Sequence, residues 1–445
     1  MRERNDVLGA RRLLATEFHN LKRPLTQRLF KSEFARNIAA LMTGTSVAQA
    51  VPLLLSPVTT RLFRPEDYGV LAIYMTVAGV LAVFATGQYA QAILLPKEES
   101  EAINLLALSV TIAGIVGILT FLIPLLFGGI IATWLANQEV KDWLYLIPIS
   151  VFLNGIIQSL TVWASRQKLF TYVAKVQVAQ VCLGLSVQLI FGLLKPGVSG
   201  LILGLLTGYM VNAGLLLHKF WQEKRGSLSS VTVRDMLGQA SQHQRFFKYS
   251  LPIELLNTST NQLPVMMLNT FFGSAAVGHY GLAQRILGLP ISLISSSTAD
   301  VFRQRASSDY AHFGSCQEIF VKTMKGLFAI SIIPFLALVF LAPPLFTFAF
   351  GARWREAGVF TQVLGVLFFF RFTCSPLSIL YTIAGRQKED MWLHILMVAI
   401  TTYAIYLGAS LSTKPFVAIL LFSLSYSMIY LTYLVRSYGF SKGNK

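Results

Sequence analysis

The sequence predicts an all-α membrane protein, and three observations lead to that fold class. Of its 445 residues, 54% are apolar and only 13% are charged, whereas soluble domains carry about 25% charged residues. The mean hydropathy is correspondingly high, at +0.59. Apolar runs long enough to cross a hydrocarbon layer of about 30 Å as helices recur along the whole chain.

The charge and the cysteines exclude several classes of function. A net charge of +17 would suggest nucleic acid in a soluble chain, but in a membrane protein it reflects Lys and Arg in cytoplasmic loops. The chain shows no basic recognition helix and no aromatic stacking module, so we expect no nucleic-acid partner. Cys182, Cys316 and Cys374 lie far apart without metal-ligand spacing. We therefore expect no metal, no cofactor and no enzymatic activity.

The chain begins with a basic segment, residues 1–36, in which Lys and Arg alternate with Leu and Phe. This pattern is typical of an amphipathic stretch on the anionic inner leaflet. The first apolar span lies within 37–69, and further spans are expected at about 70–95, 103–135, 143–165, 172–194 and 197–218. A polar linker at 219–245 follows, and then six more spans at about 246–272, 275–300, 320–350, 358–383, 391–411 and 414–435, with a tail at 436–445.

Loop charges predict the orientation of these twelve spans. When the loops are assigned alternately from a cytoplasmic start, the inner loops hold roughly a fourfold excess of Lys and Arg over the outer ones. The excess indicates that both termini are cytoplasmic.

An internal repeat divides the chain into two halves. FRPEDYG at 63–69 aligns with FGSAAVG at 272–278, and the RQK of 166–168 aligns with that of 386–388. Each half holds six spans, an even number, so both halves enter the membrane from the same side. The repeat predicts two parallel six-helix bundles, residues 37–218 and 246–435, around a central cavity.

Two corresponding spans carry polar stripes. In the first, Thr45, Gln49 and Ser56 recur at helical spacing; the seventh has Glu254, Asn257, Thr258, Asn261 and Gln262 on one predicted face. Such side chains can simply bond neighbouring helices. Because the stripe occurs independently in both halves, we expect it to line a cleft, with spans 1, 2, 7 and 8 as its walls.

Other polar residues within or beside the spans extend this expected lining. Gln88 and Gln91 lie toward the inner end of the second span, and Arg61 lies at the exit of the first. Arginine inside a span normally faces a cavity, an anion or an acidic partner. For Arg285 in the eighth span an ion pair with Glu254 is the alternative, and Arg371 in the tenth span could instead reach the interface.

The stretch NIAALMTGTSVAQAVPLLLSPVTTRLF, followed by RPEDYGVLAIY, resembles the opening of bacterial oligosaccharide flippases of the Wzx type. These belong to the multidrug/oligosaccharidyl-lipid/polysaccharide exporter (MOP) superfamily, which includes the MATE exporters, and the similarity extends from about Phe34 to Tyr433. The resemblance implies a MATE/MOP-like fold in a bacterial cytoplasmic (inner) membrane. It also implies translocation of a polyprenyl-pyrophosphate-linked oligosaccharide to the outer leaflet by alternating access, for O-antigen, capsule or exopolysaccharide synthesis.

The expected partners are then this lipid-linked oligosaccharide, membrane lipids, and a repeat-unit polymerase with its chain-length regulator. The substrate-binding candidates are Gln49, Arg61, Gln88, Gln91, Asn257, Asn261, Gln262, Arg285 and Arg371, and Glu254 is the candidate for ion coupling. Two alternatives stay open. A cation-coupled multidrug exporter would prefer a more acidic cavity, and a membrane scaffold for polysaccharide assembly would not need polar faces toward a cleft.

Overall fold

The computed structural model describes residues 33–134, 141–226 and 231–443. These residues form helices joined by short turns, and no strand occurs among them. The predicted basic segment 1–36 lies outside the described residues except for its last four, which begin the first described helix, α3.

The helices of the first half contact one another closely, above all α10 with α3 and α11, and α9 with α7 and α11. A short helix on the linker, α12 (Val233–Gln242), packs against α7. The helices of this half are α3 (Glu33–Leu54), α4 (Ser56–Leu62), α5 (Pro65–Ala82), α6 (Tyr89–Ala92), α7 (Glu99–Trp134), α8 (Lys141–Leu144), α9 (Ile147–Arg166), α10 (Phe170–Leu194) and α11 (Val198–Lys224).

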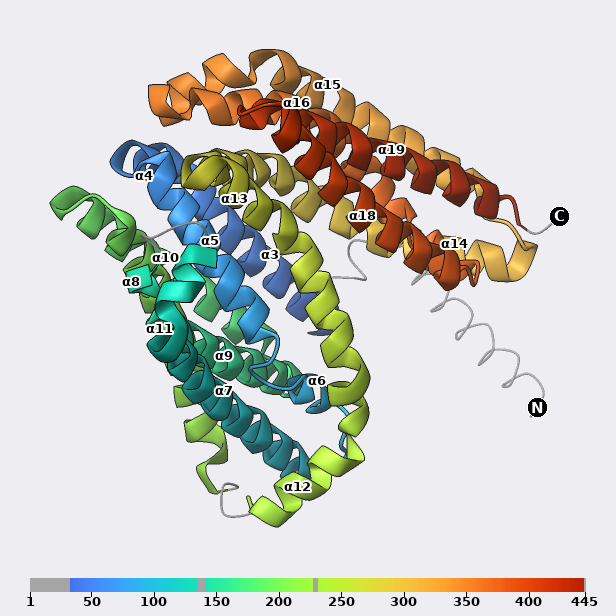
Figure 1. The fold of residues 1–445 in the computed structure, drawn as a ribbon. Helices are drawn as coiled ribbons and strands as arrows, with labels where there is room; N and C mark the ends of the chain where they lie inside the picture. The colour runs from blue at the N-terminus through green and yellow to red at the C-terminus, as the bar shows by residue number, and fades with distance from the viewer. Residues whose placement is uncertain (1–32, 135–140, 227–230, 444–445) are drawn as a thin grey trace, which may run out of the picture.

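In the second half, α16 is central and contacts α13, α15 and α19, while α18 packs on α19. Figure 1 shows the first part of α13 running from α12, at the bottom of the view, toward α4 near the top, and its second part turning back toward α14. The helices of this half are α13 (Leu251–Pro290), α14 (Ser296–Phe313), α15 (Gln317–Phe350), α16 (Arg355–Leu377), α17 (Leu380–Ile383), α18 (Gln387–Leu411) and α19 (Pro415–Ser441), with a 3₁₀ turn η5 at Ala352–Trp354.

The second predicted span, 70–95, is not one helix. α5 ends at Ala82, residues 83–88 form consecutive turns, and α6 covers only 89–92. Gln88 adopts a left-handed conformation with φ of 63°, which is uncommon for a residue with a side chain. This interruption frees backbone groups of the second span from regular helical hydrogen bonding.

A sharp kink divides α13 at Gly273, where φ is 80° and ψ is 177°. Only glycine adopts this backbone geometry without strain. The kink lies between the predicted seventh span, 246–272, and the predicted eighth span, 275–300.

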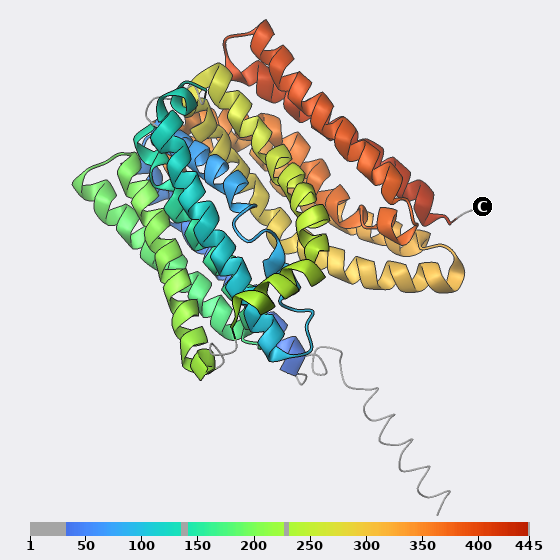
Figure 2. The ribbon, with the colours of Figure 1, turned by 60° about the horizontal axis from the view of Figure 1, so that its bottom comes forward.

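The two halves meet along α5 and α13, which lie side by side in Figures 1 and 2. A Cβ atom at Gly69 would overlap the carbonyl oxygen of Ser274, and one at Gly278 would overlap that of Pro65. The repeat aligns Gly69 with Gly278 and Pro65 with Ser274, so the two contacts are reciprocal. The predicted duplication therefore appears in the packing as a near-symmetric seam, which we call the glycine seam (Gly69, Gly278, Pro65 and Ser274).

Contacts beside the glycine seam join the halves at the same end of the molecule. The Trp354 indole donates a hydrogen bond of 2.8 Å to the Thr60 carbonyl, and the rings of Trp354 and Tyr68 lie 5.3 Å apart. The Arg61 guanidinium is 3.5 Å from the Phe348 carbonyl. We call this end, where α4 and α5 meet α13, α15 and η5, the closed end.

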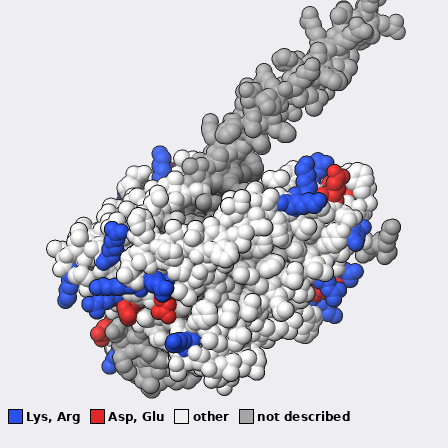
Figure 3. Space-filling model, turned by 90° about the horizontal axis from the view of Figure 1, so that it is seen from above, with Lys and Arg blue, Asp and Glu red and all other residues white. Residues whose placement is uncertain are grey.

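Among the described residues, eight helices are long and apolar enough to cross a membrane. α5 and α13 fall outside this set, because the polar residues that each contains lower their hydropathy. Figure 3 shows charged residues gathered toward two opposite ends of one face, with a broad band of uncharged residues between them. Such a band is typical of a surface that faces lipid.

Candidate functional site

A polar pocket of about 310 Å³ lies where the interrupted second span meets α9 and the first part of α13. We call it the amide pocket and define it by its five polar residues. Its lining residues are Gly79, Ala82, Val83, Gln88, Asn154, Ile157, Gln158, Glu254 and Thr258. Both halves of the chain therefore contribute to one pocket.

Turn residues 83–88 hold one wall of the amide pocket in place. The Thr86 hydroxyl donates to Gln158 Oε1 at 3.0 Å. Gln88 is buried, its Nε2 lies 3.4 Å from the Val83 carbonyl, and its Oε1 accepts a hydrogen bond of 2.7 Å from Gln91 Nε2. Gln91 itself is exposed and acts on the pocket through Gln88.

The opposite wall comes from α9, which the sequence reasoning did not consider. Ser150, Asn154 and Gln158 follow one another at steps of four residues and so share a helix face. The Asn154 side chain donates to the Ser150 carbonyl at 2.8 Å, and the Ser150 and Tyr74 hydroxyls lie 2.6 Å apart. This i, i+4, i+8 spacing of polar residues in an apolar run was the signal that could have identified α9.

The polar stripe predicted for the seventh span is divided in the structure. Glu254 and Thr258 line the amide pocket, and one turn further on Gln262 Oε1 accepts a hydrogen bond of 2.9 Å from Thr76 of α5. Asn257 and Asn261 instead lie exposed beside this face, and Asn261 Nδ2 donates to the Asn257 carbonyl at 2.9 Å. The expectation of a single shared face was too wide, because positions i, i+3, i+4, i+7 and i+8 together span about 140° of the helix circumference.

The predicted walls were partly wrong. The amide pocket is formed by α5, α9, α13 and the turns of 83–88, whereas neither α3 nor the part of α13 beyond Gly273 contributes a lining residue. Gln49 lies exposed on α3, and α3 packs against α10, where Thr45 donates to Gln177 at 3.2 Å. Gln49 is therefore outside the amide pocket.

The structure does not support an ion pair between Glu254 and Arg285. Within the described residues neither side chain takes part in a salt bridge. Arg285 is exposed on the second part of α13, in the neighbourhood of Tyr68 near the closed end. Glu254 lies in the amide pocket, on the first part of α13. The positive and negative charges predicted for the site are thus separated.

Arg371 and Arg61 lie away from the amide pocket. The Arg371 guanidinium is half-buried, 5.6 Å from the centroid of the Phe368 ring, which is one turn away on α16. Arg61 is exposed at the closed end. Of the predicted site residues, the structure therefore places Gln88 and Glu254 in the amide pocket. Gln91 contacts Gln88, Gln262 lies one turn beyond Thr258, and the three arginines lie outside the pocket.

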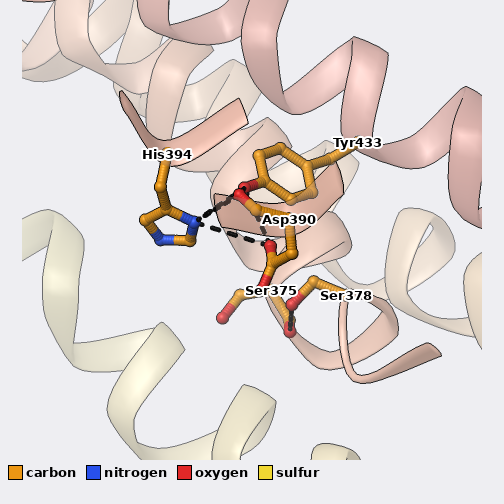
Figure 4. Close-up of polar contacts among 5 residues, drawn as sticks. All are labelled: Ser375, Ser378, Asp390, His394 and Tyr433. Atoms are coloured by element: carbon orange, nitrogen blue, oxygen red, sulfur yellow. Dashed lines mark hydrogen bonds and ion pairs between the residues drawn. The ribbon is translucent and has the colours of Figure 1, made fainter. Parts of the chain in front are cut away.

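A second polar cluster joins α18 to α19 (Figure 4). The Tyr433 hydroxyl lies 3.0 Å from Asp390 Oδ1 and 2.8 Å from His394 Nδ1. Ser375 and Ser378 lie nearby, where the Ser378 hydroxyl donates to the Ser375 carbonyl. These groups satisfy one another's hydrogen-bonding capacity, and Tyr433 is buried. We therefore interpret the cluster as a structural contact that holds the start of α18 against α19.

The fold is that of transporters of the MOP superfamily. A multidrug-resistance MATE family transporter of that superfamily, in its inward-facing conformation, matches with a TM-score of 0.63 at 15% identity, over 89% of this chain and 93% of the other. The lipid II flippase MurJ, in an inward closed conformation, matches with a TM-score of 0.64 at 16% identity, over 88% of this chain and 86% of MurJ.

The family model described as "Polysaccharide biosynthesis protein" matches residues 58–359, and the chain belongs to this family. The Teichuronic acid biosynthesis protein TuaB of Bacillus subtilis is 22% identical over 61% of this chain, a match that spans only 55% of TuaB. The Succinoglycan biosynthesis transport protein ExoT of Rhizobium meliloti is 23% identical over 84% of this chain and 74% of its own length.

Proposed function

We propose that this protein is a flippase that moves a polyprenyl-pyrophosphate-linked oligosaccharide from the inner to the outer leaflet of a bacterial cytoplasmic membrane. The observation that carries this proposal is the amide pocket, built jointly by both halves of a transporter fold within the polysaccharide biosynthesis family. Amide, hydroxyl and carboxylate groups are suited to the many donors and acceptors of a sugar.

An apolar pocket of about 240 Å³ supports an amphiphilic substrate. It is lined by α5, α7, α8, α9 and Met266 of α13. Met266 follows Glu254, Thr258 and Gln262 at steps of four residues, so one face of α13 passes from polar to apolar. A substrate with a polar sugar head and an apolar isoprenoid tail changes from polar to apolar in the same way along its length.

We propose that the chain crosses the membrane twelve times in two parallel six-helix bundles. α3, the broken α5–α6 segment and the two parts of α13 would then count as four spans beside the eight apolar helices. The closed end would face outward, and the cycle would open it by rocking the halves apart at the glycine seam. The expected partners remain membrane lipids, a repeat-unit polymerase and a chain-length regulator.

This topology predicts that both chain ends face the cytoplasm. Single cysteines at Lys445 and at Arg2, introduced after removal of the three native cysteines, should resist a membrane-impermeant maleimide in intact cells and react after permeabilisation. A cysteine at Lys414, in a predicted outer loop, should react without permeabilisation. Labelling of only one terminus in intact cells would contradict the even number of spans.

Within the proposal, the pyrophosphate is bound at successive stages of translocation by Arg285, Arg61 and Arg371. A guanidinium group suits this role because it can donate two parallel hydrogen bonds to phosphate oxygens. Gln88, Gln91 and Gln262 shape the sugar site, while Gln49, Asn257 and Asn261 would meet the substrate only when the halves move. Glu254 remains the candidate for coupling to a proton or another cation.

Translocation in vesicles tests the proposal. The purified protein, reconstituted with a fluorescent polyprenyl-pyrophosphate oligosaccharide, should expose the labelled sugar to an external quencher faster than protein-free vesicles do. Gln158→Leu should slow this roughly threefold to tenfold, because each lost hydrogen bond is worth about 0.5–1.5 kcal/mol. Gln222→Leu, at an exposed position near the end of α11, is the control. Wild-type vesicles indistinguishable from protein-free vesicles would refute the function.

Multidrug export is the second candidate, and the Glu254 carboxylate favours it. A carboxylate without a cationic partner in a polar pocket can accept a cationic drug. The same vesicles, loaded with a cationic dye instead of the lipid, distinguish the two functions. Dye movement without lipid movement would establish the exporter.

A further inference from the structure

We infer that the amide pocket selects sugars without negative charge, and that Glu254 is the residue that determines this specificity. The inference rests on the proposed function, and it names the chemical class of sugar that the site accepts. It concerns the part of the substrate that enters the pocket, separately from the pyrophosphate.

The composition of the pocket is the first step. Its polar lining consists of three amides, one hydroxyl and one carboxylate, and none of its lining residues is basic. The Glu254 carboxylate has no salt bridge among the described residues, and its contact with the Thr258 hydroxyl is long, at 3.4 Å. A uronic acid or a phosphate-bearing sugar in this pocket would place a second negative charge beside Glu254, and none of the lining residues carries a positive charge to balance it.

Neutral sugars match the same groups well. A carboxylate only accepts hydrogen bonds and a sugar hydroxyl can donate one, so the two are complementary. Hydrogen bonds to an ionised acceptor are stronger than neutral ones. Gln158 Oε1 is held by Thr86, while its Nε2 donates to none of the described residues. Gln158 thus offers a donor beside the acceptor of Glu254, in an orientation that the fold already fixes.

The positions of the basic residues indicate that the uncharged sugar and the anionic pyrophosphate bind at different places. Arg285 is near Tyr68 toward the closed end and Arg371 lies against Phe368, so neither lines the amide pocket. Anionic and uncharged parts of one substrate are therefore expected in different places. Specificity for the sugar and attraction for the pyrophosphate would not compete for the same residues.

The experiment compares two lipid-linked substrates that differ only in one hexose, which is either neutral or the corresponding uronic acid. Each is reconstituted with the full-length protein in vesicles, and translocation rates are measured under identical conditions. We expect the wild-type protein to translocate the neutral substrate at least tenfold faster. In Glu254→Gln the ratio should fall toward one, mainly because the uronic substrate becomes faster. Glu223→Gln, which removes an exposed carboxylate paired with Lys219 on α11, should keep the wild-type ratio.

The outcomes distinguish failure of the inferred sugar specificity from failure of the proposed flippase function. Equal rates for both sugars in the wild-type protein would overturn the inference while the flippase function stands. Glu254→Gln that slows both sugars equally, and changes the dependence on proton or sodium concentration, would assign Glu254 to coupling and also overturn it. Movement of neither sugar would refute the proposed function itself.

Discussion

Replacing Gly69 by alanine should open the closed end of the protein and stop export. The added Cβ would overlap the Ser274 carbonyl oxygen, which belongs to the backbone of α13 and cannot rotate away. Overpacking of this kind costs about 1–3 kcal/mol, and each 1.4 kcal/mol changes an equilibrium about tenfold. The conformation with the glycine seam in contact should therefore lose population by roughly tenfold or more. Gly278→Ala should do the same, because it meets Pro65 in the reciprocal contact.

Thiol labelling measures this shift. Thr60 is 2% exposed, and its carbonyl accepts the hydrogen bond from Trp354 across the closed end. In a background without native cysteines, Thr60→Cys should react slowly with an impermeant maleimide, and Gly69→Ala should raise the rate about tenfold.

Gly281→Ala is the matched control for labelling and export. Gly281 lies on α13, as Gly278 does, and no atom of the described residues lies within 4 Å of a Cβ built there. Unchanged labelling in both seam variants, at normal protein levels, would show that this contact does not govern the conformation. If neither Gly69→Ala nor Gly278→Ala yielded membrane-inserted protein, the glycine seam would be required for folding instead.

The seam also shows what the sequence was able to predict. The alignment of 63–69 with 272–278 rests on spacing within a duplicated chain, and the structure brings these two segments together as equivalents. Hydropathy located the long apolar helices to within a few residues, because length and apolar content decide whether a segment can cross a membrane. α15, expected at 320–350, is found at Gln317–Phe350.

The local details of the site could not be predicted from periodicity. A hydropathy window cannot reveal the turns at 83–88, because the segment is apolar whether or not it is helical. The left-handed Gln88 is buried, and its side chain hydrogen-bonds with the Val83 carbonyl and with Gln91, contacts that periodicity does not encode. Helical spacing did bring Glu254, Thr258 and Gln262 together, but only contacts with α5 and α9 separate their row from Asn257 and Asn261.

Replacing Arg285 by alanine should abolish export while the protein stays folded and inserted. A pyrophosphate with two negative charges gains roughly 4–5 kcal/mol on leaving an inside-negative cell at 100 mV, at about 2.3 kcal/mol per charge. The membrane potential thus favours export, and the barrier is the desolvation of the anion at mid-membrane. Arg285 is exposed and has no salt bridge among the described residues, so its guanidinium is free to compensate for that desolvation.

Arg285→Lys distinguishes a substrate contact from a packing role. A lysine keeps the point charge but loses the paired hydrogen bonds of the guanidinium, so export should recover in part. Arg225→Ala is the control, because Arg225 lies at the end of α11, over the Trp221 ring, and lines none of the pockets described above. Export is measured as surface polysaccharide in cells with matched protein levels. Full export by Arg285→Ala would remove this residue from the mechanism, and the passage of the pyrophosphate would then depend on Arg371 and Arg61 or on a protonated headgroup.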